Sequence, residues 1–193
     1  IHLQPVKEHR FLIVLRGDGL SGELADTDPQ ETGHAPLDAR AFTDSPEAKK
    51  TVDIVQQFQE RAKEVLADQH PANMVLLRGF AKFPQWPQFP ECFGVKAAAI
   101  ASYPMYRGVA KLIGMEALET GMTLSDEVDT LKQHWNDYDF FYVHVKKIDS
   151  YGEDGDYEHK VQLIEEADQM IADIMALNPD AIVVTGDHST PST

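Results

Sequence analysis

Two short segments in the last third of the chain are rich in side chains that bind metal ions. The first segment, "KKIDSYGEDGD", contains four carboxylates, at Asp149, Glu153, Asp154 and Asp156. The second, "TGDHSTP", contains Asp187 and His188. Carboxylate oxygens and imidazole nitrogens suit Zn²⁺, Mn²⁺ and similar ions. Acidic, glycine-rich turns are also common as solvated loops, so either segment alone is better explained as an ordinary turn.

The elements around these segments are expected to bring them together. The apolar run 139–145, "DFFYVHV", predicts a strand buried on both faces. An amphipathic pattern over 156–177 predicts a helix, and "AIVV" at 181–184 predicts a further strand. Such a strand–helix–strand unit forms parallel strands, whose carboxyl ends lie at one edge of the sheet, where ligands bind. Together, the two segments therefore favour a metal site over two unrelated turns.

Basic residues form a second group of candidates in an otherwise acidic chain. Five of them stand at expected strand ends or helix starts: Arg10, Arg16, Arg78, Lys96 and Arg107. The planar guanidinium group matches phosphate and carboxylate groups. Arg78 and Arg107 each precede a glycine, which allows a ligand to approach the backbone closely. The alternative for each basic residue is a pair with a local carboxylate.

Four further residues have side chains that could do chemistry but weaker patterns. His144 alternates with two valines and is expected to be a packed core residue. His9 is either a ligand or an exposed polar residue, and the role of His34 stays open. Cys92 has neither a histidine nor a helix start nearby, which predicts a buried, inert thiol.

The composition excludes several classes of partner. With 17 basic and 32 acidic residues the net charge is −15, which argues against nucleic acid and anionic membranes. No apolar run approaches the roughly 20 residues of a membrane-spanning helix. A single cysteine excludes an internal disulfide and suits a reducing compartment, so a cytoplasmic location is expected.

The rest of the chain reads as alternating helices and strands in two parts. A buried strand is expected at 10–17, followed by a long acidic loop, and a second short strand at 73–79. Between them, Ser45 is expected to cap a helix that ends near residue 67. The proline-rich segment 83–94, too broken for a helix, predicts a boundary between residues 1–90 and 91–193. After it we expect a strand near 95–101, a helix from Pro104, and a helix capped by Ser125 that ends near Trp135.

At this point the motifs resemble a known family. "KKIDSYGEDGDYEHK" followed by "VVTGDHSTP" is similar to the cofactor-independent phosphoglycerate mutases of the archaeal type, in the alkaline phosphatase superfamily. The segments "EHRFLIVLRG", "DTDP", "ANMVLLRG" and "YRGVAKLIGM" resemble further segments of that family in the same order. The resemblance thus covers nearly the whole chain. It implies an α/β fold, with a partial alkaline-phosphatase-like three-layer core around a parallel sheet and a small α/β cap.

The resemblance also implies an activity and a set of site residues. The family interconverts 3-phosphoglycerate and 2-phosphoglycerate through a phosphoserine, with two divalent ions, Mn²⁺ or Zn²⁺. Asp187 and His188 match ligands of one ion, and Asp149 matches a ligand of the other. The substrate-binding positions fall at Arg10, Arg78 and Arg107.

The chain departs from the family pattern in two respects. Glu153 stands where the family has a histidine, and a carboxylate there would be a harder ligand. The nucleophilic serine, an N-terminal metal aspartate and a later histidine have no counterpart. We therefore expect a central portion of a mutase that is inactive alone. The rival interpretations are another enzyme of the superfamily, such as a phosphopentomutase or phosphodiesterase, and a non-catalytic module that binds a metal or phosphate.

Overall fold

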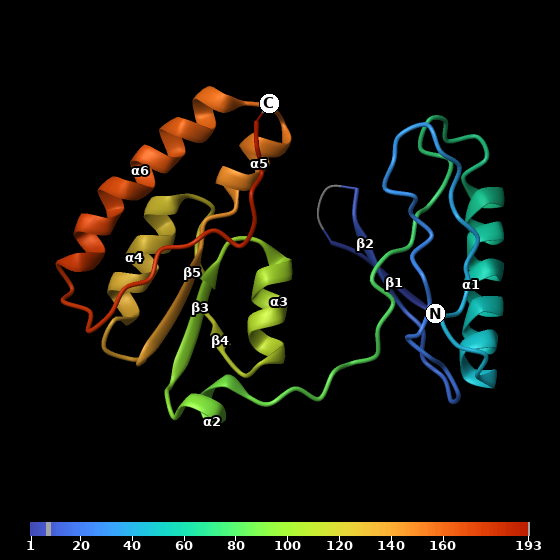
Figure 1. Cartoon of the computed structure of the whole chain (residues 1–193), viewed down its shortest axis with the longest axis horizontal. Coiled ribbons are helices and arrows are strands. Elements are labelled where there is room, and N and C mark those ends of the chain that lie inside the picture. Colours follow the sequence, from blue (N-terminus) through green and yellow to red (C-terminus); the bar gives the residue numbers. More distant parts are fainter. Residues whose placement is uncertain (7–8, 193) are drawn as a thin grey trace. The chain divides into compact units, whose positions relative to one another are not determined.

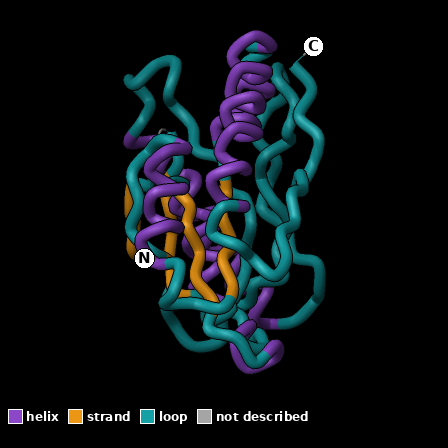
Figure 2. Tube along the Cα trace, turned by 90° about the vertical axis from the view of Figure 1, so that its left-hand side faces the viewer, coloured by secondary structure: helices purple, strands orange, loops and turns teal. Residues whose placement is uncertain are grey.

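The computed structural model describes residues 1–6 and 9–192, and these form two compact units, Ile1–Pro84 and Gln85–Thr193. The division lies inside the proline-rich segment. Figure 1 labels the helices and strands of both units. Figure 2 shows that long loops connect many of these helices and strands.

The first unit combines a small antiparallel sheet with one long helix. Strands β1 (His2–Pro5) and β2 (Phe11–Val14) pair in antiparallel register, and a long loop then leads to α1 (Pro46–Val65). Helix α1 begins as predicted, because the Ser45 side chain accepts a hydrogen bond from the Ala48 N–H. The small core of this unit contains four buried residues, Leu24, Ala39, Val55 and Leu77.

Two predictions for the first unit are wrong in part. Strand β2 is only half-buried rather than buried, since it pairs with β1 in a two-stranded sheet and leaves Leu12 exposed. Residues 73–79 do not form a strand. Their hydrogen bonds go to the loop around Thr27 instead: the Thr27 N–H donates to the Leu77 carbonyl, and the Leu77 N–H donates to the Thr27 hydroxyl. An apolar run such as 73–79 favours an extended backbone, but a strand also needs a neighbouring strand to pair with, and the sequence of the run does not show whether one is present.

The second unit is a three-layer α/β structure around a parallel sheet, as predicted. The sheet has the order β4-β3-β5, from strands β3 (Ala97–Ala101), β4 (Glu116–Ala117) and β5 (Phe140–His144). Helix α3 (Pro104–Leu112) covers one face, while α4 (Leu124–His134) and α6 (Tyr157–Met175) cover the other (Figure 1).

The alanine-rich sequence of β3 follows from this position between helices. Every side chain of β3 is buried. Ala97 and Ala99 face the side of α3, whereas Ala98 and Ile100 face α4 and α6. Small side chains on both faces let the helices approach the central strand closely.

Several local predictions for the second unit are wrong. The capping residue of α4 is Thr123, not Ser125: its hydroxyl accepts from the Asp126 N–H, and the Asp126 carboxylate accepts from the Thr123 N–H. The proline-rich connector contains a short helix, α2 (Phe89–Phe93), which begins with Pro90 in its first turn. Cys92 lies on this helix and is exposed rather than buried.

The segment 181–184, predicted to be a strand, is not one in the structure. Val183 and Val184 are 84% and 74% exposed, so the apolar pattern is not used for pairing within the described residues. The described part of the chain also contains no helix that could span a membrane.

Candidate metal site

The candidate metal ligands lie where the C-terminal segment returns to the end of β5. Strand β5 leads directly into α5 (Lys147–Glu153), which is a short helix where we expected a turn. The segment after α6 runs back across this unit and ends beside α5 (Figure 1). It approaches α5 closely at Gly152, where an added Cβ would lie 2.4 Å from the carbonyl oxygen of Thr190. Glycine at this position therefore permits the contact.

Asp149, in the first turn of α5, is the centre of the polar contacts. The Lys146 ammonium group donates to its Oδ2, and the Thr190 hydroxyl donates to its Oδ1. Lys146 and Asp149 are 19% and 17% exposed, so their ion pair is largely shielded from solvent. Burial acts to raise the pKa of Asp149, but the hydrogen bonds from Lys146 and Thr190 outweigh it and lower that pKa.

His188 faces the two carboxylates. Its Nε2 lies 3.8 Å from Asp149 Oδ1 and 3.7 Å from Asp187 Oδ2. Two atoms that bind one ion at about 2.0–2.2 Å lie roughly 3–4 Å apart, so both separations match those of ligand pairs. Glu153 is more remote: it is 59% exposed, and its Oε2 lies 3.8 Å from the Lys146 ammonium group.

The donor types fit a divalent ion, whereas a complete ligand set is not formed. Within residues 1–6 and 9–192, no group of three or more His, Cys, Asp or Glu side chains is arranged to hold a metal ion. Both oxygens of Asp149 accept hydrogen bonds, one of them from the Lys146 ammonium group. Lys146 thus provides the positive charge that a metal ion would provide at this carboxylate.

Two aromatic rings adjoin the site: that of Tyr106, which our sequence analysis did not single out, and that of His144, which it expected to be a packed core residue. The Tyr106 hydroxyl, on α3, donates to Asp187 Oδ2 over 3.4 Å, and its ring stacks on that of His144 with 3.5 Å between the centroids. Burial, followed by the charge of Asp187, raises the pKa of Tyr106, and burial lowers the pKa of His144. His144 is half-buried in this stack. The period-two alternation of β5 could have indicated that Tyr142 and His144 share the face covered by α3.

The predicted substrate-binding arginines are divided between the two units. Arg10 and Arg78 belong to the first unit, where Arg78 pairs with Asp28 at 3.5 Å. Arg107, in the second unit, pairs with the carboxylate of Glu119. For Arg78 and Arg107 the structure therefore shows the local carboxylate pairs that were the alternative, and a role in substrate binding stays a prediction.

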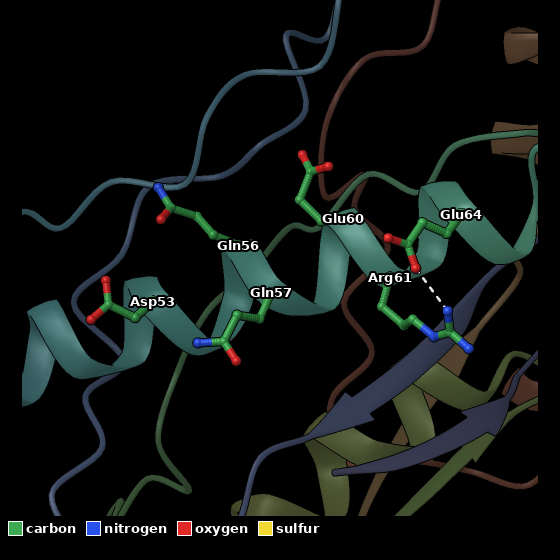
Figure 3. A pocket seen from close by; sticks show the side chains of 6 residues that line it. All are labelled: Asp53, Gln56, Gln57, Glu60, Arg61 and Glu64. Atoms are coloured by element: carbon green, nitrogen blue, oxygen red, sulfur yellow. Dashed lines mark hydrogen bonds and ion pairs between the residues drawn. The ribbon is translucent and has the colours of Figure 1, made fainter.

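A shallow hollow in the first unit does not have the features of an active site. It has a volume of about 460 Å³ and lies along the polar face of α1. Figure 3 shows the polar and charged side chains that line it, with one ion pair between Arg61 and Glu64 at 2.7 Å. This pattern is typical of the solvated face of an amphipathic helix.

Comparisons with known proteins agree with the motifs. The "Probable 2,3-bisphosphoglycerate-independent phosphoglycerate mutase" of Thermotoga maritima is 55% identical over 99% of this chain and 47% of its own length. The protein of the same name from Thermus thermophilus is 47% identical over 100% of this chain and 48% of its own length. The resemblance to this family that the sequence motifs indicated is thereby confirmed. The chain spans about half the length of the curated relatives it matches.

Solved structures show a similar fold. The PH0037 protein of Pyrococcus horikoshii is 29% identical, with a TM-score of 0.63 over 76% of this chain and 44% of that one. A cofactor-independent phosphoglycerate mutase from Thermoplasma acidophilum is 23% identical, with a TM-score of 0.52 over 82% of this chain and 43% of that one. The model of the Metalloenzyme superfamily matches residues 23–193. Because this match covers most of the sequence, the chain belongs to the Metalloenzyme superfamily.

Proposed function

We propose that this chain is part of a 2,3-bisphosphoglycerate-independent phosphoglycerate mutase, a cytoplasmic isomerase of glycolysis and gluconeogenesis, and that it carries a portion of its metal centre. The observation that carries the proposal is the 55% identity to relatives of that name over 99% of the chain. The contacts among Asp149, Asp187 and His188 support it, because they join the ligand types of the family's motifs at ligand-like separations.

The described side chains have distinct tasks in this proposal. Asp187 and His188 would hold one ion and Asp149 the other, with Glu153 as a further carboxylate that could turn towards the second ion. Two bound divalent ions, Mn²⁺ or Zn²⁺, would supply the positive charge that stabilises the attacking and leaving oxygens of phosphoryl transfer. Lys146 balances the charge of Asp149 and Glu153.

Substrate binding would fall to the arginines. Phosphoglycerate carries a phosphate and a carboxylate, and a guanidinium group can bind either in a bidentate manner. The Arg107 pair with Glu119 can be exchanged for such a ligand, because Glu119 is 87% exposed and its ion pair is therefore weak. In this proposal residues 1–90 form the cap with Arg10 and Arg78, and residues 91–193 form part of the core.

An enolase-coupled assay tests the proposal. A protein of the relatives' full length that carries this chain should convert 3-phosphoglycerate in the presence of Mn²⁺ or Zn²⁺. It should lose that activity when its ions are removed with EDTA and the EDTA is dialysed away before the coupled assay, and regain it when Mn²⁺ or Zn²⁺ is added back. The present chain alone should be inactive, since none of its motifs matches the family segment that carries the nucleophilic serine. Activity of the longer protein on pentose phosphates instead would identify a phosphopentomutase and refute the proposal. Turnover by the present chain alone would refute the assigned division of the active site.

A further inference from the structure

Thr190 connects three parts of the candidate site. Its hydroxyl donates to Asp149 Oδ1 and lies 3.1 Å from Nδ1 of His188. Its backbone carbonyl accepts a hydrogen bond from the Lys160 ammonium group on α6. The residue is therefore held by its backbone, independently of what its hydroxyl does. Neither the motif chemistry nor the proposed ligand set assigns that hydroxyl a role.

The donors and acceptors around Nδ1 of His188 indicate that this nitrogen carries a proton. A hydroxyl group has one hydrogen to donate, and a carboxylate oxygen accepts it. Because the Thr190 hydrogen points to Asp149, the hydroxyl oxygen can only accept from His188, which requires a proton on Nδ1. A second contact agrees with this assignment: the carbonyl oxygen of Ser189, which can only accept, lies 3.3 Å from the same Nδ1.

We infer that Thr190 is a positioning residue for His188: its hydroxyl selects the Nδ1–H form of the imidazole, so that the lone pair of Nε2 faces Asp149 and Asp187. Nε2 lies 3.8 Å and 3.7 Å from those carboxylates. A histidine that binds a metal ion does so through its unprotonated nitrogen, and a hydrogen bond from the other nitrogen fixes its orientation. The claim that this form of the ring promotes metal binding rests on the proposed function. The claim that Nδ1 carries the proton does not.

The experiment compares three variants of the full chain. Thr190→Val removes the hydroxyl with little change of shape and keeps the backbone contact with Lys160. Thr190→Ser keeps the hydroxyl. Thr185→Val is the matched control, since it makes the same substitution in the same segment, at a hydroxyl that donates to the neighbouring Gly186 carbonyl over 3.1 Å.

Nuclear magnetic resonance of the imidazole nitrogens gives the first measurement. Long-range ¹⁵N–¹H couplings, recorded in alkaline buffer with EDTA, distinguish the two neutral forms of the ring, and His188→Gln identifies the His188 signals. We expect the Nδ1–H form in the wild type, in Thr190→Ser and in Thr185→Val. Thr190→Val should show a clear gain of the Nε2–H form. An Nε2–H form in the wild type, or an unchanged ring in Thr190→Val, overturns the inference.

Calorimetric titration with Zn²⁺ gives the second measurement. Loss of a hydrogen-bond partner behind a metal ligand typically weakens binding 10–100-fold, so we expect Thr190→Val to bind Zn²⁺ at least about tenfold more weakly than the wild type. Thr190→Ser should regain most of the affinity. An equal loss in Thr185→Val would show a general structural effect and overturn the inference. If the hydroxyl sets the form of the ring but His188→Gln leaves Zn²⁺ binding unchanged, the proposed metal site fails and the positioning role stands.

Discussion

The buried carboxylate of Glu127 should make the stability of the second unit depend on pH. Glu127 lies on α4 and is 2% exposed. Its Oε1 accepts a hydrogen bond of 3.3 Å from the N–H of Ser102, directly after β3. Burial raises the pKa of Glu127 from 4.5 to about 7, although the hydrogen bond from Ser102 acts in the opposite direction. The folded chain therefore holds this proton more tightly than the unfolded chain does.

The size of the effect follows from this difference in pKa. A raised carboxylate pKa contributes stability that is complete below about 4.5 and is lost as the pH rises through about 7. At about 1.4 kcal/mol per pH unit, the loss over that interval is about 3 kcal/mol. Above pH 7 the folded state holds an ionised carboxylate in a buried position, and the free energy of unfolding no longer changes because of Glu127.

The substitution Glu127→Gln isolates this contribution. Glutamine has the shape of the protonated side chain and keeps an acceptor for Ser102, but it does not titrate. We expect the variant to be more stable than the wild type by about 2–3 kcal/mol at about pH 8.5, and by less than about 1 kcal/mol at about pH 5. Urea unfolding at both pH values, followed by tryptophan fluorescence, measures the difference, because Trp86 and Trp135 both lie in the second unit.

A control corrects for the change in net charge. Glu165→Gln removes the same charge from an exposed position on α6. Its effect at each pH is subtracted from that of Glu127→Gln. If the corrected stability difference is the same at about pH 5 and about pH 8.5, Glu127 is ionised in the folded chain at both values, and the reasoning from its burial is refuted.

Three further substitutions test the packing of the second unit by urea unfolding. Leu131→Ala should cost about 2–5 kcal/mol because this α4 side chain is fully buried against the sheet; a loss below about 1 kcal/mol would contradict the packing. Lys146→Met in EDTA should cost about 1.5–3 kcal/mol, since Asp149 keeps a shielded charge without its cation; an unchanged midpoint would contradict the ion pair. Gly152→Ala should move Thr190 away from α5, shift the His188 resonances and cost about 1–3 kcal/mol, whereas unchanged spectra would contradict the close approach.

The sequence predicted the second unit better than the first for a physical reason. The elements of the parallel sheet carry their own signals: β3 and β5 are apolar runs of strand length, and α3 and α6 show helical periodicity. In the first unit, residues 73–79 have an equally apolar pattern but bond to a loop through Thr27. A side-chain hydroxyl 50 positions away in the sequence leaves no periodic trace, so this contact could not be predicted.

At the candidate site, too, the sequence did not show which contacts bring the residues together. Asp149 and His188 were expected to approach because a strand at 181–184 would align beside β5, and that strand is not present in the described residues. They approach nonetheless, 3.8 Å apart. The contacts that hold them are local: Gly152 leaves room for the Thr190 backbone, and the Thr190 hydroxyl joins Asp149 to His188.

Residue spacing could therefore identify the ligand types but not the means of their approach. A glycine without a side chain and a threonine hydroxyl carry no pattern that distinguishes them from ordinary turn residues. Their importance appears only when the carboxylate, the imidazole and the backbone of α5 are placed in space. It follows that substitutions at Gly152 and Thr190 should disturb His188 more than substitutions in the exposed apolar run 181–184, although the sequence pattern alone would give the opposite order.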